Sequence, residues 1–64
     1  MSHLHPSNVE RFEKSIYQAL LTDTDARTTI AMLRQDIVDG VGTEEWRAAL
    51  AQAIERFEAR QVQA

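Results

Sequence analysis

The sequence predicts an all-α fold, a small three-helix bundle able to self-associate. Apolar residues recur at a period of about 3.6 almost throughout the 64 residues. No strand-like alternation is sustained, and cap- and turn-forming residues at 22–25 and 40–43 divide the chain into three segments. The expected helices cover residues 8–21, 24–39 and 44–60, in a single domain over 7–61 between an irregular lead-in at 1–6 and a frayed tail at 62–64.

The first helix has a clear start signal. Ser7 is followed three residues later by Glu10, which matches a capping box in which each residue satisfies an amide hydrogen of the other. Ser7 is therefore the expected N-cap. The apolar stripe that follows consists of Val9, Phe12, Ile16 and Leu20.

The second helix is bounded by an acidic cap and a glycine. Asp23 or Thr24 is the expected N-cap, because a side-chain oxygen there accepts from an amide of the first turn. Gly40 is expected to end the helix in the left-handed conformation, which costs glycine no steric strain. The stripe between them consists of Ala26, Ile30, Leu33 and Ile37.

The third helix follows Thr43, the expected N-cap, and carries Glu44 and Glu45 at the positive end of its dipole. Its five internal alanines are explained by helix propensity alone. Its stripe consists of Trp46, Leu50, Ala53 and Phe57, with Ala49 and Ile54 on the flanks.

Short connections make consecutive helices antiparallel neighbours, and the predicted core is the sum of the three stripes. An alternative arrangement is a hairpin of the second and third helices that dimerises, with the first helix packed across it. A domain of this size buries only about 60% of its unfolded surface, so a monomer is expected to be marginally stable.

Composition excludes several classes of function. There is no cysteine, and both histidines, His3 and His5, lie in the first five residues, so no metal site and no catalytic centre built on these residues is expected in the fold. The carboxylates have no cleft in which to act, so we expect no enzyme, cofactor or small-molecule substrate. No apolar run could span a membrane and no signal peptide is recognisable, so the cytoplasm is the expected location.

A net charge of −3 gives no general attraction to nucleic acid. The second and third helices have the layout of a helix-turn-helix, but Glu44 and Glu45 would face the phosphates. Arg47, Arg56 and Arg60 are also spread along the third helix and interrupted by acids. A small dimeric DNA-binding regulator or antitoxin is therefore kept only as the alternative function.

Four large apolar residues of the first two helices fall outside the core stripes: Tyr17, Leu21, Met32 and Val38. A helix of a monomeric bundle needs one apolar face, whereas the second helix carries apolar residues on more than one. The sequence therefore predicts a non-catalytic protein-protein interaction module, an adaptor, inhibitor, small chaperone or immunity-type accessory. Its partner is another protein or a second copy in a homodimer, and these four residues are the expected contact.

Overall fold

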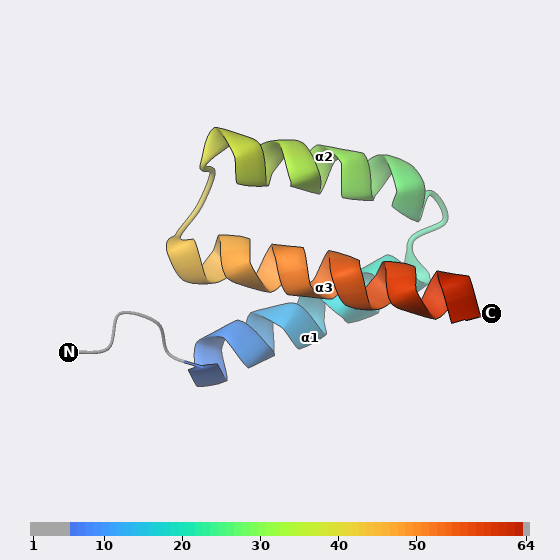
Figure 1. The fold of residues 1–64 in the computed structure, drawn as a ribbon, viewed down its shortest axis with the longest axis horizontal. Coiled ribbons are helices and arrows are strands. Elements are labelled where there is room, and N and C mark those ends of the chain that lie inside the picture. The colour runs from blue at the N-terminus through green and yellow to red at the C-terminus, as the bar shows by residue number, and fades with distance from the viewer. Residues whose placement is uncertain (1–5, 64) are drawn as a thin grey trace.

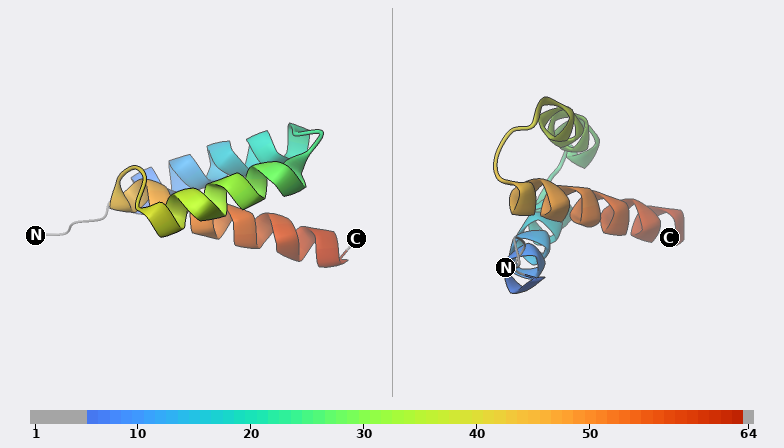
Figure 2. Two further views of the ribbon diagram at one scale, coloured as in Figure 1. Left: turned by 90° about the horizontal axis from the view of Figure 1, so that it is seen from above. Right: turned by 60° about the vertical axis from the view of Figure 1, so that its left-hand side comes forward.

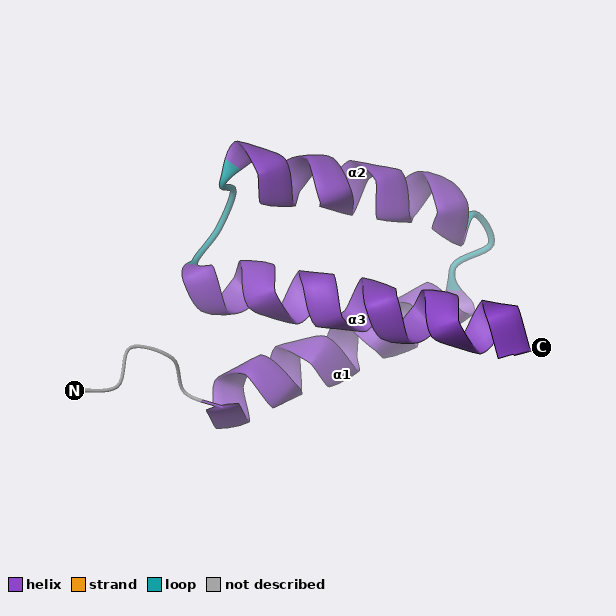
Figure 3. Cartoon of the chain, viewed as in Figure 1, coloured by secondary structure: helices purple, strands orange, loops and turns teal. Residues whose placement is uncertain are grey.

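Residues 6–63 form three α-helices in the computed structural model, which describes these residues and the side chains of 8–62 (Figures 1 and 3). The helices are α1 (Pro6–Thr22), α2 (Ala26–Asp39) and α3 (Glu44–Gln63). No strand occurs within 6–63. The prediction of an all-α three-helix bundle is confirmed.

The start of α1 differs from the prediction. The helix begins at Pro6, which places Ser7 inside the first turn and makes the expectation of Ser7 as N-cap wrong. Proline suits the first helical position, because its φ is already helical and no hydrogen bond needs its missing N–H there. The rest of the expected lead-in, residues 1–5, lies outside the described residues.

The entry into α2 is built around Asp23, although not as an N-cap. The helix begins at Ala26, so Asp25 takes the cap position, without a side-chain cap bond, in place of the expected Asp23 or Thr24. The Asp23 carboxylate instead accepts from the backbone N–H of Asp25, at 2.8 Å, and from the hydroxyl of Thr29. It thereby ties the connection to the first turn of α2, as an Asx-turn does.

This arrangement predicts a pH-dependent contribution to stability. The pKa of Asp23 is lowered below its ordinary 3.8, first by the hydrogen bond from Thr29 and then by that from Asp25. A depressed folded-state pKa adds stability that is present above the unfolded-state pKa and lost as pH falls through the folded-state value. Asp23→Asn should therefore be less stable than wild type at neutral pH, with the difference shrinking in acid. Urea unfolding of wild type and variant at neutral and at acidic pH tests this prediction. Thr29→Val removes the hydroxyl that donates to Asp23, so it should remove most of the pH dependence. A difference independent of pH would contradict it.

The end of α2 confirms the expected role of Gly40. Gly40 has φ 74° and ψ 28°, in the left-handed region. Its N–H donates to the carbonyl of Ile37, and the N–H of Val41 donates to the carbonyl of Asp36 at 2.9 Å. These two bonds form a Schellman motif and satisfy carbonyls that the end of the helix would leave unpaired. The guanidinium of Arg47 donates to the carbonyls of Gly40 and Gly42 and so holds the turn from the other side.

The two glycines of this turn should differ in their tolerance of alanine. Both have positive φ, which costs a residue with a Cβ about 1–2 kcal/mol. A Cβ at Gly40 would meet no atom within 4 Å, whereas one at Gly42 would lie 2.7 Å from Cδ1 of Trp46. Gly42→Ala should therefore destabilise the protein more than Gly40→Ala in urea unfolding. Equal losses would show that Trp46 moves aside freely.

The start of α3 is as predicted and its end is not. The hydroxyl of Thr43 accepts from the N–H of Trp46 at 3.0 Å, which confirms the expected N-cap, and Glu44 and Glu45 lie in the first turn. The helix continues to Gln63, through residues expected to lie beyond its end. The last four carbonyls of a helix have no N–H partner within it wherever it ends, so without a capping residue the sequence does not fix the last helical residue.

The central helix is α3. The chain runs up, down and up, so that α1 and α3 point the same way and α2 points against both (Figures 1 and 2). α3 packs most extensively on α1 and less on α2, while α1 and α2 contact each other little. Each outer helix therefore buries its apolar stripe chiefly against α3.

The core contains most of the residues of the predicted stripes, but two residues of α3 that were expected at the flanks are among the most buried. Ala49, Leu50 and Ala53 are completely buried, and Ile54 is only 3% exposed, although Ala49 and Ile54 were expected at the flanks. Ala49 and Ala53 lie two turns and one turn before Arg56, on the face of α3 from which Arg56 contacts Glu13 of α1. Small side chains on that face let the two helices approach closely. The remaining buried residues are Val9, Ile16, Leu20, Ile30 and Phe57. The other predicted core residues pack against them half-buried: Phe12, Ala26, Leu33, Ile37 and Trp46.

Candidate interaction surfaces

The four residues expected to bind a partner lie in two separate places. Tyr17 and Leu21 line one hollow along α1, and Met32 and Val38 lie exposed on α2. No contact or hollow in the described part of the chain joins the two pairs. The single contact surface that the sequence suggested is therefore two surfaces on different helices.

Tyr17 takes part in the contact between α1 and α3. It is half-buried, the guanidinium carbon of Arg56 lies 5.5 Å from its ring centroid, and Arg60 donates to its hydroxyl at 3.4 Å. Arg56 also pairs with Glu13 of α1 at 3.0 Å. Arg56 and Arg60 are four residues apart on α3, so their like charges repel each other mildly. Tyr17 and Glu13 offset that repulsion, because a ring face and a carboxylate both attract a cation.

The hollow that Tyr17 shares with Leu21 is wide and mostly charged. It has a volume of about 920 Å³, and Leu21, 42% exposed, is its main aliphatic residue. Such a lining is typical of a solvated surface, where exposed ion pairs contribute only tenths of a kcal/mol. Its lining residues are Glu10, Arg11, Glu13, Lys14, Tyr17, Gln18, Leu21 and Arg56.

The outward face of α2 is apolar or neutral along most of its length. Met32 is 65% exposed and Val38 is 78% exposed. At 100° per residue, Thr28, Ala31 and Gln35 lie on the same arc of roughly 120°, and all three are exposed. We call these five residues the α2 stripe. Arg27 and Arg34 lie beside the stripe, while Asp39, which accepts from Gln35, lies on the same arc at the last residue of α2.

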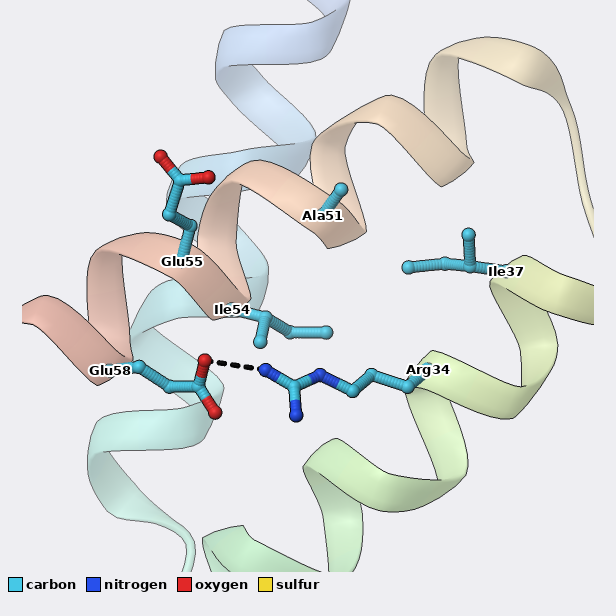
Figure 4. Close-up of a pocket in the computed structure, with 6 residues that line it drawn as sticks. All are labelled: Arg34, Ile37, Ala51, Ile54, Glu55 and Glu58. Atoms are coloured by element: carbon cyan, nitrogen blue, oxygen red, sulfur yellow. Dashed lines mark hydrogen bonds and ion pairs between the residues drawn. The ribbon is translucent and has the colours of Figure 1, made fainter.

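Charged contacts hold α2 to α3 beside this stripe. Figure 4 shows Arg34 of α2 reaching across to Glu58 of α3, with Ile54 of α3 next to the pair. The surrounding hollow has a volume of about 220 Å³. Both side chains of the ion pair remain about half exposed, so the pair orients α2 more than it stabilises it.

A further hollow was missed by sequence reasoning, and it is the most apolar of those described. It has a volume of about 220 Å³ and lies where α1 and α2 separate above α3. Sequence reasoning placed most of its lining residues in a closed core. The small residues Ala19 and Thr29 at the borders of two stripes were the available signal. The lining residues are Ile16, Ala19, Leu20, Asp23, Thr29, Leu33, Trp46 and Leu50.

Two features are absent from the part of the chain that the structure describes: a group of metal ligands and a membrane-spanning helix. No three His, Asp or Glu residues within it gather so as to hold a metal ion. Within the same range, no helix has the length and apolar character needed to cross a membrane.

Comparison with protein-family models, curated proteins and solved structures finds no match to this chain. The surfaces themselves therefore carry the functional argument.

Proposed function

We propose that this protein is a non-catalytic interaction module that binds another helix through the α2 stripe. The observation that carries the proposal is the pair of exposed apolar side chains, Met32 and Val38, on a face whose charge is confined to Asp39 at the end of α2. Large exposed apolar residues that share a helix face mark interaction surfaces more often than scattered ones do. Methionine also adapts its shape to different partners.

A second copy of the chain is the first partner to test. With 64 residues, the monomer has a small core, and such domains often gain stability by association. Packing two α2 stripes together would bury Met32 and Val38 twice, once in each copy. The module would work in the cytoplasm as an adaptor, inhibitor, small chaperone or immunity-type accessory, since its chain contains no cysteine and needs no disulfide.

Binding to DNA has less support. Arg47, which a helix-turn-helix would present near the start of its recognition helix, donates instead to the carbonyls of Gly40 and Gly42. Arg56 is paired with Glu13. Glu44 and Glu45 remain at the helix end that would approach the phosphates, and their charge opposes that approach.

The test replaces Met32 and Val38 together by glutamate. Wild type should elute as a dimer in light scattering coupled to size exclusion, with a Tm that rises with protein concentration. Met32→Glu with Val38→Glu should be monomeric, with a Tm independent of concentration. Val62→Glu is the matched control, because Val62 is 87% exposed and lies on α3, away from the stripe. Self-association through the α2 stripe is refuted if wild type and the double variant have the same oligomeric state and the same dependence of Tm on concentration. It is wrong altogether if every partner isolated with wild type also binds the double variant.

A further inference from the structure

The apolar hollow between α1 and α2 exists because both helices pack on α3 and scarcely on each other. Leu50 and Ile16 are buried beneath it, while the half-buried Leu33 and Trp46 stand at its sides. Trp46 is held there by Phe12, whose ring meets it edge to face with centroids 5.5 Å apart. The tryptophan ring is therefore a fixed wall and does not need to rearrange when a ligand enters.

The hollow has the size of one large side chain. An apolar cavity of about 150 Å³ can hold a benzene molecule. The volume here is about 220 Å³, which accommodates an aromatic or branched aliphatic side chain. It is too small for a whole cofactor and too apolar for a charged metabolite.

The charge around the hollow has one sign. Asp23 lies in its lining, and no Arg or Lys does. Asp25 is four residues before Thr29, and Asp36 is three residues after Leu33, so each lies one helical turn from a lining residue on the same side of α2.

The described bases all have other places in the fold. Arg11, Lys14 and Arg56 line the hollow on the other side of α1. Arg27 and Arg34 line a hollow between α2 and α3, Arg47 binds carbonyls of the α2–α3 turn, and Arg60 binds Tyr17. The apolar hollow therefore has an acidic rim without local neutralisation by a lining base.

We propose that this hollow, which Asp23 lines and from whose lining Asp25 and Asp36 are one helical turn away, binds a basic amphipathic helix of another protein, with one large apolar side chain of that helix inserted beside Trp46. A helix fits because residues 6–63 offer no strand edge to an extended peptide, and a helix satisfies its own backbone while lying between two others. Lysine or arginine on either side of the anchor would complement the rim, which steers the encounter and fixes the register. The site is separate from the α2 stripe and does not depend on the function proposed for it.

Synthetic peptides and the fluorescence of Trp46 test this directly. Trp46 is the one tryptophan of the chain and lines the hollow, so its emission reports occupancy without a label. The probe is an alanine-based peptide of roughly 18 residues, long enough to form a helix, with one phenylalanine flanked at i±4 by lysines. A second peptide has glutamate at the lysine positions, and a third has alanine in place of phenylalanine. The basic peptide should shift the emission saturably, and the other two should bind at least roughly tenfold more weakly.

Variants then locate the binding site. Ala19→Leu fills the hollow from an exposed helix position and should weaken binding at least roughly tenfold, with a thermal melt confirming that the variant is folded. Asp25→Asn with Asp36→Asn should weaken binding and flatten its salt dependence, while Asp39→Asn, an exposed acid of α2 that accepts from Gln35, is the matched control.

Three outcomes would overturn the proposal. These are an emission unchanged by the basic peptide, equal binding of the basic and acidic peptides, and unchanged affinity in a folded Ala19→Leu variant. The variant with Met32→Glu and Val38→Glu should bind the basic peptide as wild type does. Loss of binding in that variant would place the peptide on the α2 stripe instead, which would refute this inference and leave the proposed function standing.

Discussion

Leu50→Ala is expected to lower the free energy of unfolding by about 3 kcal/mol. Leu50 is completely buried in α3 and lines the apolar hollow with residues of both outer helices, so its truncation removes packing contacts with α1 and α2 together. A protein of this length has a total stability of roughly 3–10 kcal/mol, so the loss is a large fraction of the whole. Urea unfolding followed by far-UV circular dichroism measures it.

Leu21→Ala is the matched control, because it removes the same atoms from a side chain that is 42% exposed. Its cost should be well under half that of Leu50→Ala. Folding withdraws less of the Leu21 side chain from water, so truncating it loses less apolar burial. If the two variants lose equal stability, α3 does not provide the centre of the core. If Leu50→Ala is unfolded at every urea concentration, Leu50→Met, which keeps the volume, should restore folding.

Ala53→Leu is expected to destabilise the protein by about 1–3 kcal/mol, although it adds apolar surface. Ala53 is completely buried and lies one helical turn before Arg56, on the face of α3 that meets α1, so a larger side chain there should push α1 and α3 apart. The same separation would disturb the contacts of Arg56 with Glu13 and Tyr17. Thermal and urea unfolding should both show the loss.

Ala51→Leu separates packing from helix propensity. Ala51 is exposed on the same helix, and leucine is nearly as good a helix former as alanine, so this variant should be close to wild type in stability. Equal, small effects at positions 51 and 53 would mean that the alanines of α3 serve helix propensity alone. A large effect at 53 only would show that they set the distance between the helices.

Local chemistry made the three helices predictable from the sequence. Gly40 and Thr43 work as expected because a cap depends on residues within one helical turn of it. The start of α2 was less predictable, since Asp23, Thr24 and Asp25 all suit a cap and the choice rests on the hydrogen bond between Asp23 and Thr29. The start of α1 was also mispredicted, because the helix begins at Pro6 and Ser7 therefore lies in its first turn and not at the cap position.

The candidate surfaces were predictable only in part. The exposure of Met32 and Val38 followed from the helical period, because both project away from the stripe that contains Ile30 and Leu33. Tyr17 was expected to be available to a partner, but Arg56 and Arg60 from a distant part of the chain occupy its ring face and hydroxyl. Periodicity within one helix carries no information about which side chains of another helix arrive beside it.

The sequence by itself determined the number of helices, the turns between them and the apolar face of each, because these depend on interactions between residues a few positions apart. Only the tertiary structure decided that α3 is central, that Ala49 and Ala53 are completely buried, and that α1 and α2 separate to leave an apolar hollow beside Trp46. These features depend on how the apolar faces of all three helices pack together in a small volume, and that packing is set by all three helices at once.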